Sequence, residues 1–157
     1  MLKLIIGNKN YSSWSLRPWL AMRMAEIPFE EQLQPFHDHG SHDAFRAFSP
    51  TGRVPLLIDG DLNIWDSLAI VSHLAQSHPQ LWPADRAARA YALSVAAEMH
   101  SGFSELRNVC TMNCGLRIEL KSRTPALERD LARIAEIWTT GLANFGGPFL
   151  VGQSFTA

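Results

Sequence analysis

Three serine hydroxyls occupy the four positions from Ser12 to Ser15. They follow an apolar run at Leu2–Ile6 and precede a helix that the apolar spacing predicts from about Ser15 to Glu26. A hydroxyl that donates a hydrogen bond to an anion stabilises the charged form, and the amino end of a helix adds a favourable field. The same hydroxyls could instead cap the helix, which is a common role of serine at such a position. The residues alone leave both interpretations open.

A second polar pair, Asp66-Ser67, begins a helix that is predicted to reach about Ser77. The backbone N–H groups at a helix start, together with a hydroxyl, make a ready site for an anion. Both residue types are also good N-caps, so capping and ligand binding are compatible roles here. Upstream, Val54-Pro55 leads into an apolar run, and a bond before proline adopts the cis form at little cost.

The stretch from His37 to Asp43 holds three histidines, His39 among them, and two aspartates. Imidazole and carboxylate groups are zinc ligands. The stretch shows no helical histidine spacing and contains no cysteine, so we interpret it as an exposed polar loop and predict no metal site. Ser12 and Ser15 also stand where a thiol-disulfide reductase has its C-x-x-C cysteines, and without sulfur that exchange has no nucleophile.

The elements that must hold these residues alternate between strands and helices. Strands are predicted at Leu2–Ile6 and Phe29–Gln34, and the helix between them implies a parallel pair. Runs at Val54–Ile58 and Asp61–Trp65 flank Asp59-Gly60, which is a strong signal for an antiparallel hairpin. Together these patterns predict a mixed four-stranded sheet with helices.

The character of the chain changes after this sheet. Residues 79–84 contain two prolines and are predicted to be a linker between a first domain at 1–78 and a second at 85–157. The second domain shows no strand pattern. Its apolar residues recur at steps of three and four over Ala88–Cys110 and over Leu127–Phe145, and Thr124-Pro125 is a typical helix start. We therefore expect an all-helical domain.

The composition excludes several classes of protein. The chain has 157 residues, of which 46% are apolar, and a formal net charge of -1. A near-neutral chain lacks the basic surface that drives nucleic-acid binding, and this apolar content does not fit a disordered chain. No apolar run has the length of a membrane span, and the start does not resemble a signal peptide. We expect a cytoplasmic protein without nucleic-acid or membrane partners.

Three motifs occur in a specific order along the first domain. They are Ser12-Ser13-Trp14-Ser15-Leu16-Arg17 after the first strand, Val54-Pro55 before the third, and Asp66-Ser67-Leu68-Ala69-Ile70 at the third helix. Together they resemble the glutathione transferase family, in particular its serine-type zeta-like and tau-like members. The resemblance implies a thioredoxin-like domain followed by a helical bundle. One departure is Trp14, where the zeta-class motif has cysteine.

By this resemblance, the chain would be an enzyme that stabilises the thiolate of its co-substrate glutathione for attack on a small apolar electrophile. Ser12 heads the motif and would be the catalytic serine, with Ser13 and Ser15 as alternates. The residues that would hold glutathione are Arg53, Val54, Asp66, Ser67 and, as a weaker candidate, His42.

In the helical domain, Met99, Phe103 and Arg107 fall on one face of the helix predicted over Ala88–Cys110. By resemblance, that helix would wall the electrophile pocket, although an aromatic stripe at this spacing is also typical of plain core packing. A charge on such a face needs a partner, so Arg107 could bind a carboxylate of the substrate. The resemblance also implies a homodimer and a role in detoxification.

Two other functions stay open. One is a glutathione-dependent cis-trans isomerase of the maleylacetoacetate type, and the other is a transferase-fold protein that binds ligands without turnover, since one fold hosts many functions. The segment Gly152–Ala157 resembles a family segment in which Thr156 would cap a buried helix and an acidic residue would complete the capping box. We therefore expect a chain truncated at its C-terminus, with an incomplete helical domain.

Overall fold

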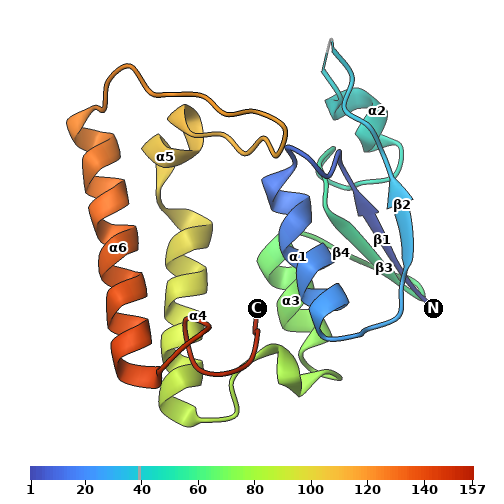
Figure 1. Cartoon of the computed structure of the whole chain (residues 1–157). Coiled ribbons are helices and arrows are strands. Elements are labelled where there is room, and N and C mark those ends of the chain that lie inside the picture. Colours follow the sequence, from blue (N-terminus) through green and yellow to red (C-terminus); the bar gives the residue numbers. More distant parts are fainter. Residues whose placement is uncertain (39) are drawn as a thin grey trace. The chain divides into compact units, whose positions relative to one another are not determined.

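The computed structural model describes residues 1–38 and 40–157. They form two compact units, Met1–Leu81 with Ala157 and Trp82–Thr156. Figure 1 labels the elements of both units. Within the described residues, none of the helices has the length and hydropathy needed to cross a bilayer.

The first unit is built on a four-stranded mixed sheet in the order β2-β1-β3-β4. The central strand β1 (Leu2–Ile6) runs parallel to β2 (Glu30–Leu33) and antiparallel to β3 (Leu56–Asp59), and β3 pairs with β4 (Leu62–Ile64) in a hairpin. The predicted sheet and its strand directions are confirmed. The third strand begins later than expected, after Pro55, whose nitrogen has no hydrogen to donate to a sheet.

Two helices, α1 (Ser13–Met24) and α3 (Ser67–Leu74), pack side by side on one face of the sheet (Figure 1). The short helix α2 (His42–Arg46) precedes β3, and a 3₁₀ turn, η1 (Pro79–Leu81), ends the segment Met1–Leu81. This is the thioredoxin-like arrangement that we expected. Its core consists mainly of the buried residues Leu4, Ile5, Ile6, Ala21, Met22, Leu56, Leu57, Ile70, Val71 and Leu74.

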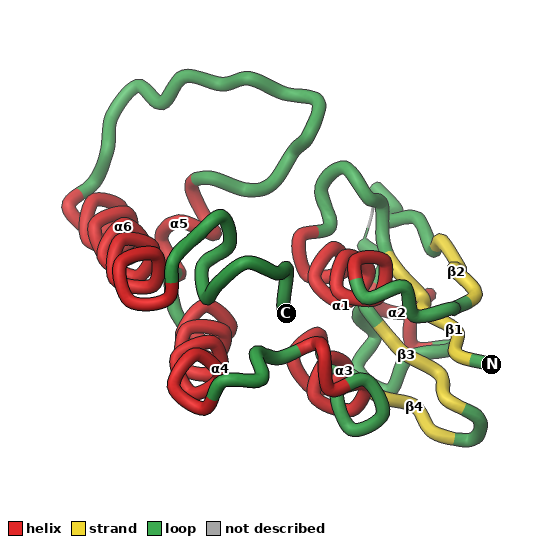
Figure 2. Tube along the Cα trace, turned by 60° about the horizontal axis from the view of Figure 1, so that its bottom comes forward, coloured by secondary structure: helices red, strands yellow, loops and turns green. Residues whose placement is uncertain are grey.

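The second unit consists of α4 (Arg86–Ser101), α5 (Ser104–Val109) and α6 (Pro125–Phe145). A long loop joins α5 to α6 (Figure 2). The helix start predicted at Thr124-Pro125 is confirmed, because Thr124 Oγ1 accepts a hydrogen bond from the Leu127 N–H at 3.1 Å. The helical character of this half of the chain is therefore as predicted.

The single helix predicted over Ala88–Cys110 is wrong. The chain leaves the helical conformation at Gly102, which is extended, and at Phe103, whose φ of 59° is left-handed. A side chain at Gly102 would place its Cβ 2.9 Å from the Glu98 carbonyl oxygen, so the sharp turn needs glycine there. The apolar steps of three and four continue across the break, which is why the periodicity did not reveal it.

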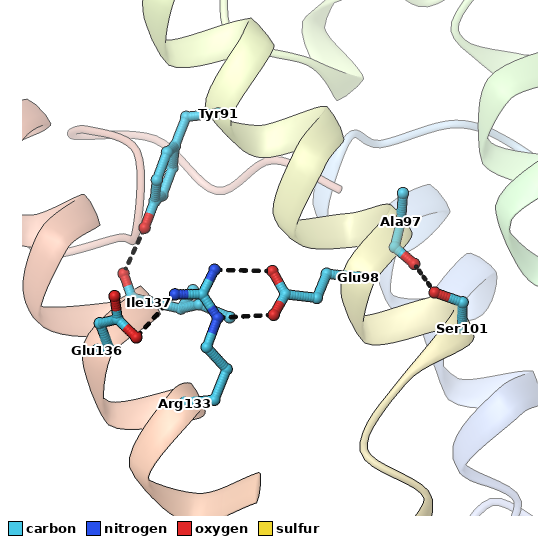
Figure 3. A network of polar contacts seen from close by, with 7 residues as sticks. All are labelled: Tyr91, Ala97, Glu98, Ser101, Arg133, Glu136 and Ile137. Atoms are coloured by element: carbon cyan, nitrogen blue, oxygen red, sulfur yellow. Dashed lines mark hydrogen bonds and ion pairs between the residues drawn. The ribbon is translucent and has the colours of Figure 1, made fainter. Parts of the chain in front are cut away.

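Polar contacts join α4 to α6 (Figure 3). The Tyr91 hydroxyl donates a hydrogen bond to the Ile137 carbonyl at 2.7 Å, and Arg133 donates two to the Glu98 carboxylate, at 2.7 and 3.0 Å. Arg133 also pairs with Glu136 at 2.8 Å. The hydrogen bonds from Arg133 hold the pKa of Glu98 below its ordinary value, against a smaller upward effect of burial.

A cluster of charged and aromatic side chains ties α1 to β2. Glu31 accepts a hydrogen bond from Trp19 Nε1 at 2.7 Å and pairs with Lys9 Nζ at 2.6 Å and with Arg23 at 3.7 Å. Lys9 and Arg23 also lie over the Trp19 ring, 5.0 and 5.5 Å from its centroid. Burial raises the pKa of Glu31, but the hydrogen bonds from Lys9 and Trp19 and the charges of Lys9 and Arg23 together hold it below its ordinary value.

We expect Glu31→Gln to lower the free energy of unfolding at neutral pH by about 1 kcal/mol. The glutamine amide is neutral, so it loses the attraction between the Glu31 carboxylate and the cations of Lys9 and Arg23. A carboxylate whose pKa is lowered by folding stabilises the protein above its unfolded-state pKa of about 4.3, and the contribution is lost as the pH falls through the folded-state pKa. Denaturant titrations should therefore show the gap between variant and wild type closing in acid.

The matched control is Glu30→Gln. Glu30 lies on the same strand and pairs with Lys3 at 3.0 Å, but its side chain is 56% exposed. Exposed ion pairs contribute little, so this variant should stay close to wild type. An equal loss in both variants, or a gap for Glu31→Gln that persists in acid, would contradict the assignment.

Candidate functional site

The first unit carries a cleft of about 680 Å³ beside the start of α1. Its lining comes from the loop between β1 and α1, from the segment around α2, and from the turn before β3. Five of the predicted site residues are brought together there, namely Ser12, Ser13, His42, Arg53 and Val54.

Ser12 occupies the N-cap position of α1, but its side chain does not cap the helix. Its hydroxyl donates a hydrogen bond to Ser15 Oγ at 2.9 Å, and the same oxygen of Ser15 accepts one from the Gly7 N–H at 3.0 Å. The interpretation of Ser12 as a helix cap is therefore wrong for its side chain. Ser15 is only 2% exposed and lies behind Ser12.

The amino end of α1 makes this side of the cleft favourable for an anion. The N–H groups of the first turn have no partner within a helix, and they carry its positive end. All residues of α1 are described, and none of those in its first turn is acidic, so no carboxylate there opposes the binding of an anion. Trp14 lines the cleft next to Ser13, and the Arg17 guanidinium lies 4.1 Å from the centroid of its ring.

The turn that carries Arg53 and Val54 is held by a buried hydroxyl. Ser49 Oγ donates a hydrogen bond to the Arg53 carbonyl at 2.7 Å and accepts one from the Arg53 N–H at 3.3 Å. The Val54–Pro55 peptide bond is cis. Because β3 pairs with its neighbours only from Leu56 onward, the backbone of Val54 takes no part in the sheet. Val54 itself lines the cleft.

His42 reaches the cleft by packing on a glycine. A Cβ at Gly52 would lie 2.7 Å from His42 Cδ2, and Gly52 has a φ of +65°. His42 Nδ1 also lies 3.2 Å from Asp43 Oδ1. Across residues 1–38 and 40–157, the structure gathers no three histidine, cysteine, aspartate or glutamate side chains that could hold a metal ion. His39, part of the predicted polar loop, lies outside the described residues.

Asp66 and Ser67 open α3 and are not part of the cleft lining described above. Asp66 Oδ1 accepts a hydrogen bond from the Leu68 N–H at 3.1 Å, so the capping role of Asp66 is confirmed. Ser67 Oγ is buried and, among the described residues, has no hydrogen-bond partner. A buried hydroxyl without a hydrogen-bond partner costs about 1–3 kcal/mol of stability. A ligand that forms a hydrogen bond with the Ser67 hydroxyl would remove this cost.

Met99, Phe103 and Arg107, predicted to lie on one helical face, instead surround the break between α4 and α5. Phe103 is buried. Arg107 Nε donates a hydrogen bond to the Gly102 carbonyl at 3.0 Å, and Arg107 Nη2 donates to the Met99 carbonyl. The guanidinium thus satisfies carbonyl groups that the end of α4 leaves without partners.

The aromatic side of the cleft was not predicted from the sequence. The ring centroids of Tyr11 and Phe36 are 5.8 Å apart, and those of Phe36 and Phe45 are 5.7 Å apart. All three residues line the cleft. They come from loops and a short helix, where periodicity gives no signal. Phe36 and Phe45 lie before and after the polar stretch from His37 to Asp43, and this pattern was the signal in the sequence that could have indicated an aromatic surface.

Comparisons with known proteins agree with this geometry. Residues 11–77 match the family model described as glutathione S-transferase, N-terminal domain. The chain is 34% identical over 136 residues to the glutathione S-transferase GstB of Escherichia coli K12, which covers 83% of this chain and 62% of that protein. It is 31% identical over 134 residues to a probable maleylacetoacetate isomerase of Vibrio cholerae, covering 78% of this chain and 62% of that protein.

The chain thus spans less than two thirds of the length of these two relatives. Among solved structures, a glutathione transferase homolog from Sulfitobacter with bound glutathione matches with a TM-score of 0.65 at 21% identity. That match covers 99% of this chain and 76% of the other. The likeness shows a shared fold.

We expect Gly52→Ala to destabilise the protein more than Gly60→Ala. Both glycines have positive φ, +65° and +58°, so each substitution costs about 1–2 kcal/mol in backbone conformation. Only at Gly52 does the new methyl group meet a neighbour, the His42 ring, which adds about 1–3 kcal/mol of overpacking. Denaturant unfolding of both variants measures the difference, and equal losses would contradict the packing of His42 on Gly52.

Proposed function

Because this chain belongs to the glutathione S-transferase family, we propose that its first unit binds glutathione and that the Ser12 hydroxyl stabilises the thiolate. The thiol gives its proton to water, and the thiolate attacks a carbon of a small apolar electrophile. A carbon–sulfur bond forms while the bond to the leaving group breaks and that group departs with the electron pair, or, in an addition to a double bond, the π electron pair takes a proton from water. One observation carries this proposal. Ser12 lines the cleft at the amino end of α1, and its hydroxyl is not used to cap the helix. The bound glutathione of the Sulfitobacter homolog supports the choice of ligand.

The task of Ser12 follows from the acidity of thiols. A free cysteine thiol has a pKa of about 8.5, so glutathione is mostly protonated at neutral pH. A hydrogen bond to a charged group contributes about 1.5–3 kcal/mol, which corresponds to roughly one to two pKa units. The positive end of α1 acts in the same direction. Ser13 lines the same cleft and stays the alternate donor, whereas Ser15 is buried behind Ser12.

The remaining site residues suit the other groups of the tripeptide. In our proposal the backbone of Val54 pairs with the cysteinyl part of glutathione, as an added strand would. The Ser67 hydroxyl and the first N–H groups of α3 hold the γ-glutamyl carboxylate, and Asp66 holds its ammonium group. Arg53 binds the glycyl carboxylate, and His42 is a further contact on the same side of the cleft.

For the electrophile we propose Met99, Phe103 and Arg107 in the second unit. This assignment rests on the resemblance, and Arg107 serves it together with the backbone contacts described above. The chain spans 62% of each of the two relatives, so the activity of the whole protein, its homodimer, its cytoplasmic location and its detoxification role stay predictions.

An isomerase is the second candidate, because one of the two relatives is named as a probable maleylacetoacetate isomerase. In that reaction the thiolate adds to the substrate and leaves again, so glutathione is not consumed. Trp14 stands where the zeta-class motif has cysteine, which favours the transferase. Turnover of maleylacetoacetate at constant glutathione would favour the isomerase. Glutathione binding without turnover of either substrate would favour a binding protein.

We expect Ser12→Ala to keep glutathione binding but to raise the pKa of the bound thiol by about one to two units. Conjugation of a chromogenic electrophile near pH 7 should then fall by about eightfold to 25-fold, because the wild-type bound thiol is already largely or partly ionised there. Ser94→Ala is the matched control, because Ser94 donates its hydroxyl only to the Ala90 carbonyl of its own helix, at 2.8 Å. Conjugation that survives in Ser12→Ala and is lost in Ser13→Ala would assign the role to Ser13.

We expect Ser67→Ala to leave the free energy of unfolding unchanged or slightly higher, because the buried hydroxyl has no partner to lose among the described residues. Glutathione binding should nevertheless weaken by about tenfold or more, since the bond that is lost is one to a carboxylate. Titration calorimetry and denaturant unfolding measure the two quantities. A marked loss of stability with unchanged affinity would show that Ser67 has only a structural role.

A further inference from the structure

We propose that Ser15 is a positioning residue for Ser12. Its hydroxyl, held by the Gly7 amide, donates a hydrogen bond to Ser12 Oγ when the Ser12 hydroxyl turns toward a glutathione thiolate. This inference rests on the proposed function and adds to it a hydrogen-bonded chain from the Gly7 N–H through Ser15 and Ser12 to the sulfur.

The atoms that form this series of hydrogen bonds lie within hydrogen-bonding distance of one another. Gly7 N lies 3.0 Å from Ser15 Oγ, and Ser15 Oγ lies 2.9 Å from Ser12 Oγ. Ser15 and Ser12 are 2% and 7% exposed, so water does not compete freely for their hydroxyls. The chain leads from the end of β1, through the first turn of α1, to the cleft.

The direction of the hydrogen bonds shows why Ser15 must take part. A serine hydroxyl has one proton and two lone pairs. In the structure Ser12 gives its proton to Ser15, so it has none left for a sulfur. When Ser12 turns its proton to the thiolate, Ser15 turns its own proton to Ser12. Both changes are rotations of hydroxyl groups, in which no covalent bond breaks and each proton stays on its oxygen.

Gly7 fixes the direction of the chain once a ligand is bound. A backbone N–H can only donate, so it keeps one lone pair of Ser15 occupied in both states. Donors in series polarise one another, which strengthens each bond by about 10–30%. The close approach also needs glycine, because a Cβ at Gly7 would lie 2.6 Å from the Phe36 ring and 3.1 Å from Ser12 Oγ.

The test measures the pKa of the bound thiol from the ultraviolet absorbance of its thiolate, on the whole chain. We expect Ser15→Ala to bind glutathione with an affinity within about twofold of wild type, but with a bound-thiol pKa about half a unit higher, which means about threefold less thiolate at a pH well below that pKa. Ser15→Thr keeps the hydroxyl and should restore the wild-type value. Ser94→Ala again serves as the control. A wild-type pKa in Ser15→Ala would overturn the inference.

A second measurement needs no substitution at Ser15, so it stands even if that variant fails to fold. The amide resonance of Gly7 should move as the thiol of bound glutathione titrates. It should not move with pH when the ligand is S-methylglutathione, which has no thiol to ionise. A Gly7 amide resonance with the same pH dependence in both complexes would overturn the proposed series of hydrogen bonds.

The two proposals fail separately in these experiments. A thiol pKa that rises in Ser12→Ala but not in Ser15→Ala overturns only the role of Ser15. A wild-type protein that shows no thermal shift with millimolar glutathione overturns the proposed function, because a ligand of the native state must stabilise it. It overturns the role of Ser15 as well.

Discussion

The junction between β1 and α1 is the constraint on which the rest of the first unit depends. A strand end and a helix start must come close enough to share hydrogen bonds, and Ser15 meets this demand by accepting the Gly7 N–H at 3.0 Å. The strand is fixed by neighbours on both sides, parallel to β2 and antiparallel to β3. The helix is fixed by its buried residues against the sheet. The packing of β1 and α1 in the core therefore determines where the serine hydroxyls at this junction lie.

Small residues also shape other parts of the cleft. Ser49 holds the turn before β3 through both polar groups of the Arg53 backbone, and Gly52 leaves room for the His42 ring. The loop before α1, the segment around α2 and the turn before β3 meet there. The aromatic rings of Tyr11, Phe36 and Phe45 close the remaining side. The cleft therefore combines polar groups with an apolar flank.

Much of this fold could be predicted from the sequence, because β1 and β3 are mostly apolar runs and the Asp59-Gly60 pair marks a hairpin. The cap at Thr124 followed from residue types alone. The break at Gly102 and Phe103 could not be predicted, since apolar steps of three and four persist through it. The choice of Ser12 over its neighbours came from a resemblance. That its hydroxyl bonds to Ser15 rather than to the helix depends on three-dimensional geometry that spacing does not report.

Trp14 gives the cleft a property that its position alone determines. Its indole lines the cavity, next to Ser13, with the Arg17 guanidinium against the ring. The emission of an indole depends on the polarity around it and on the water in contact with it. A molecule that enters the cleft would change the surroundings of Trp14, which is one of five tryptophans in the chain. Part of the protein's tryptophan emission would therefore report on occupancy of the cleft, from a position two residues along the chain from the serine that is proposed to meet the sulfur.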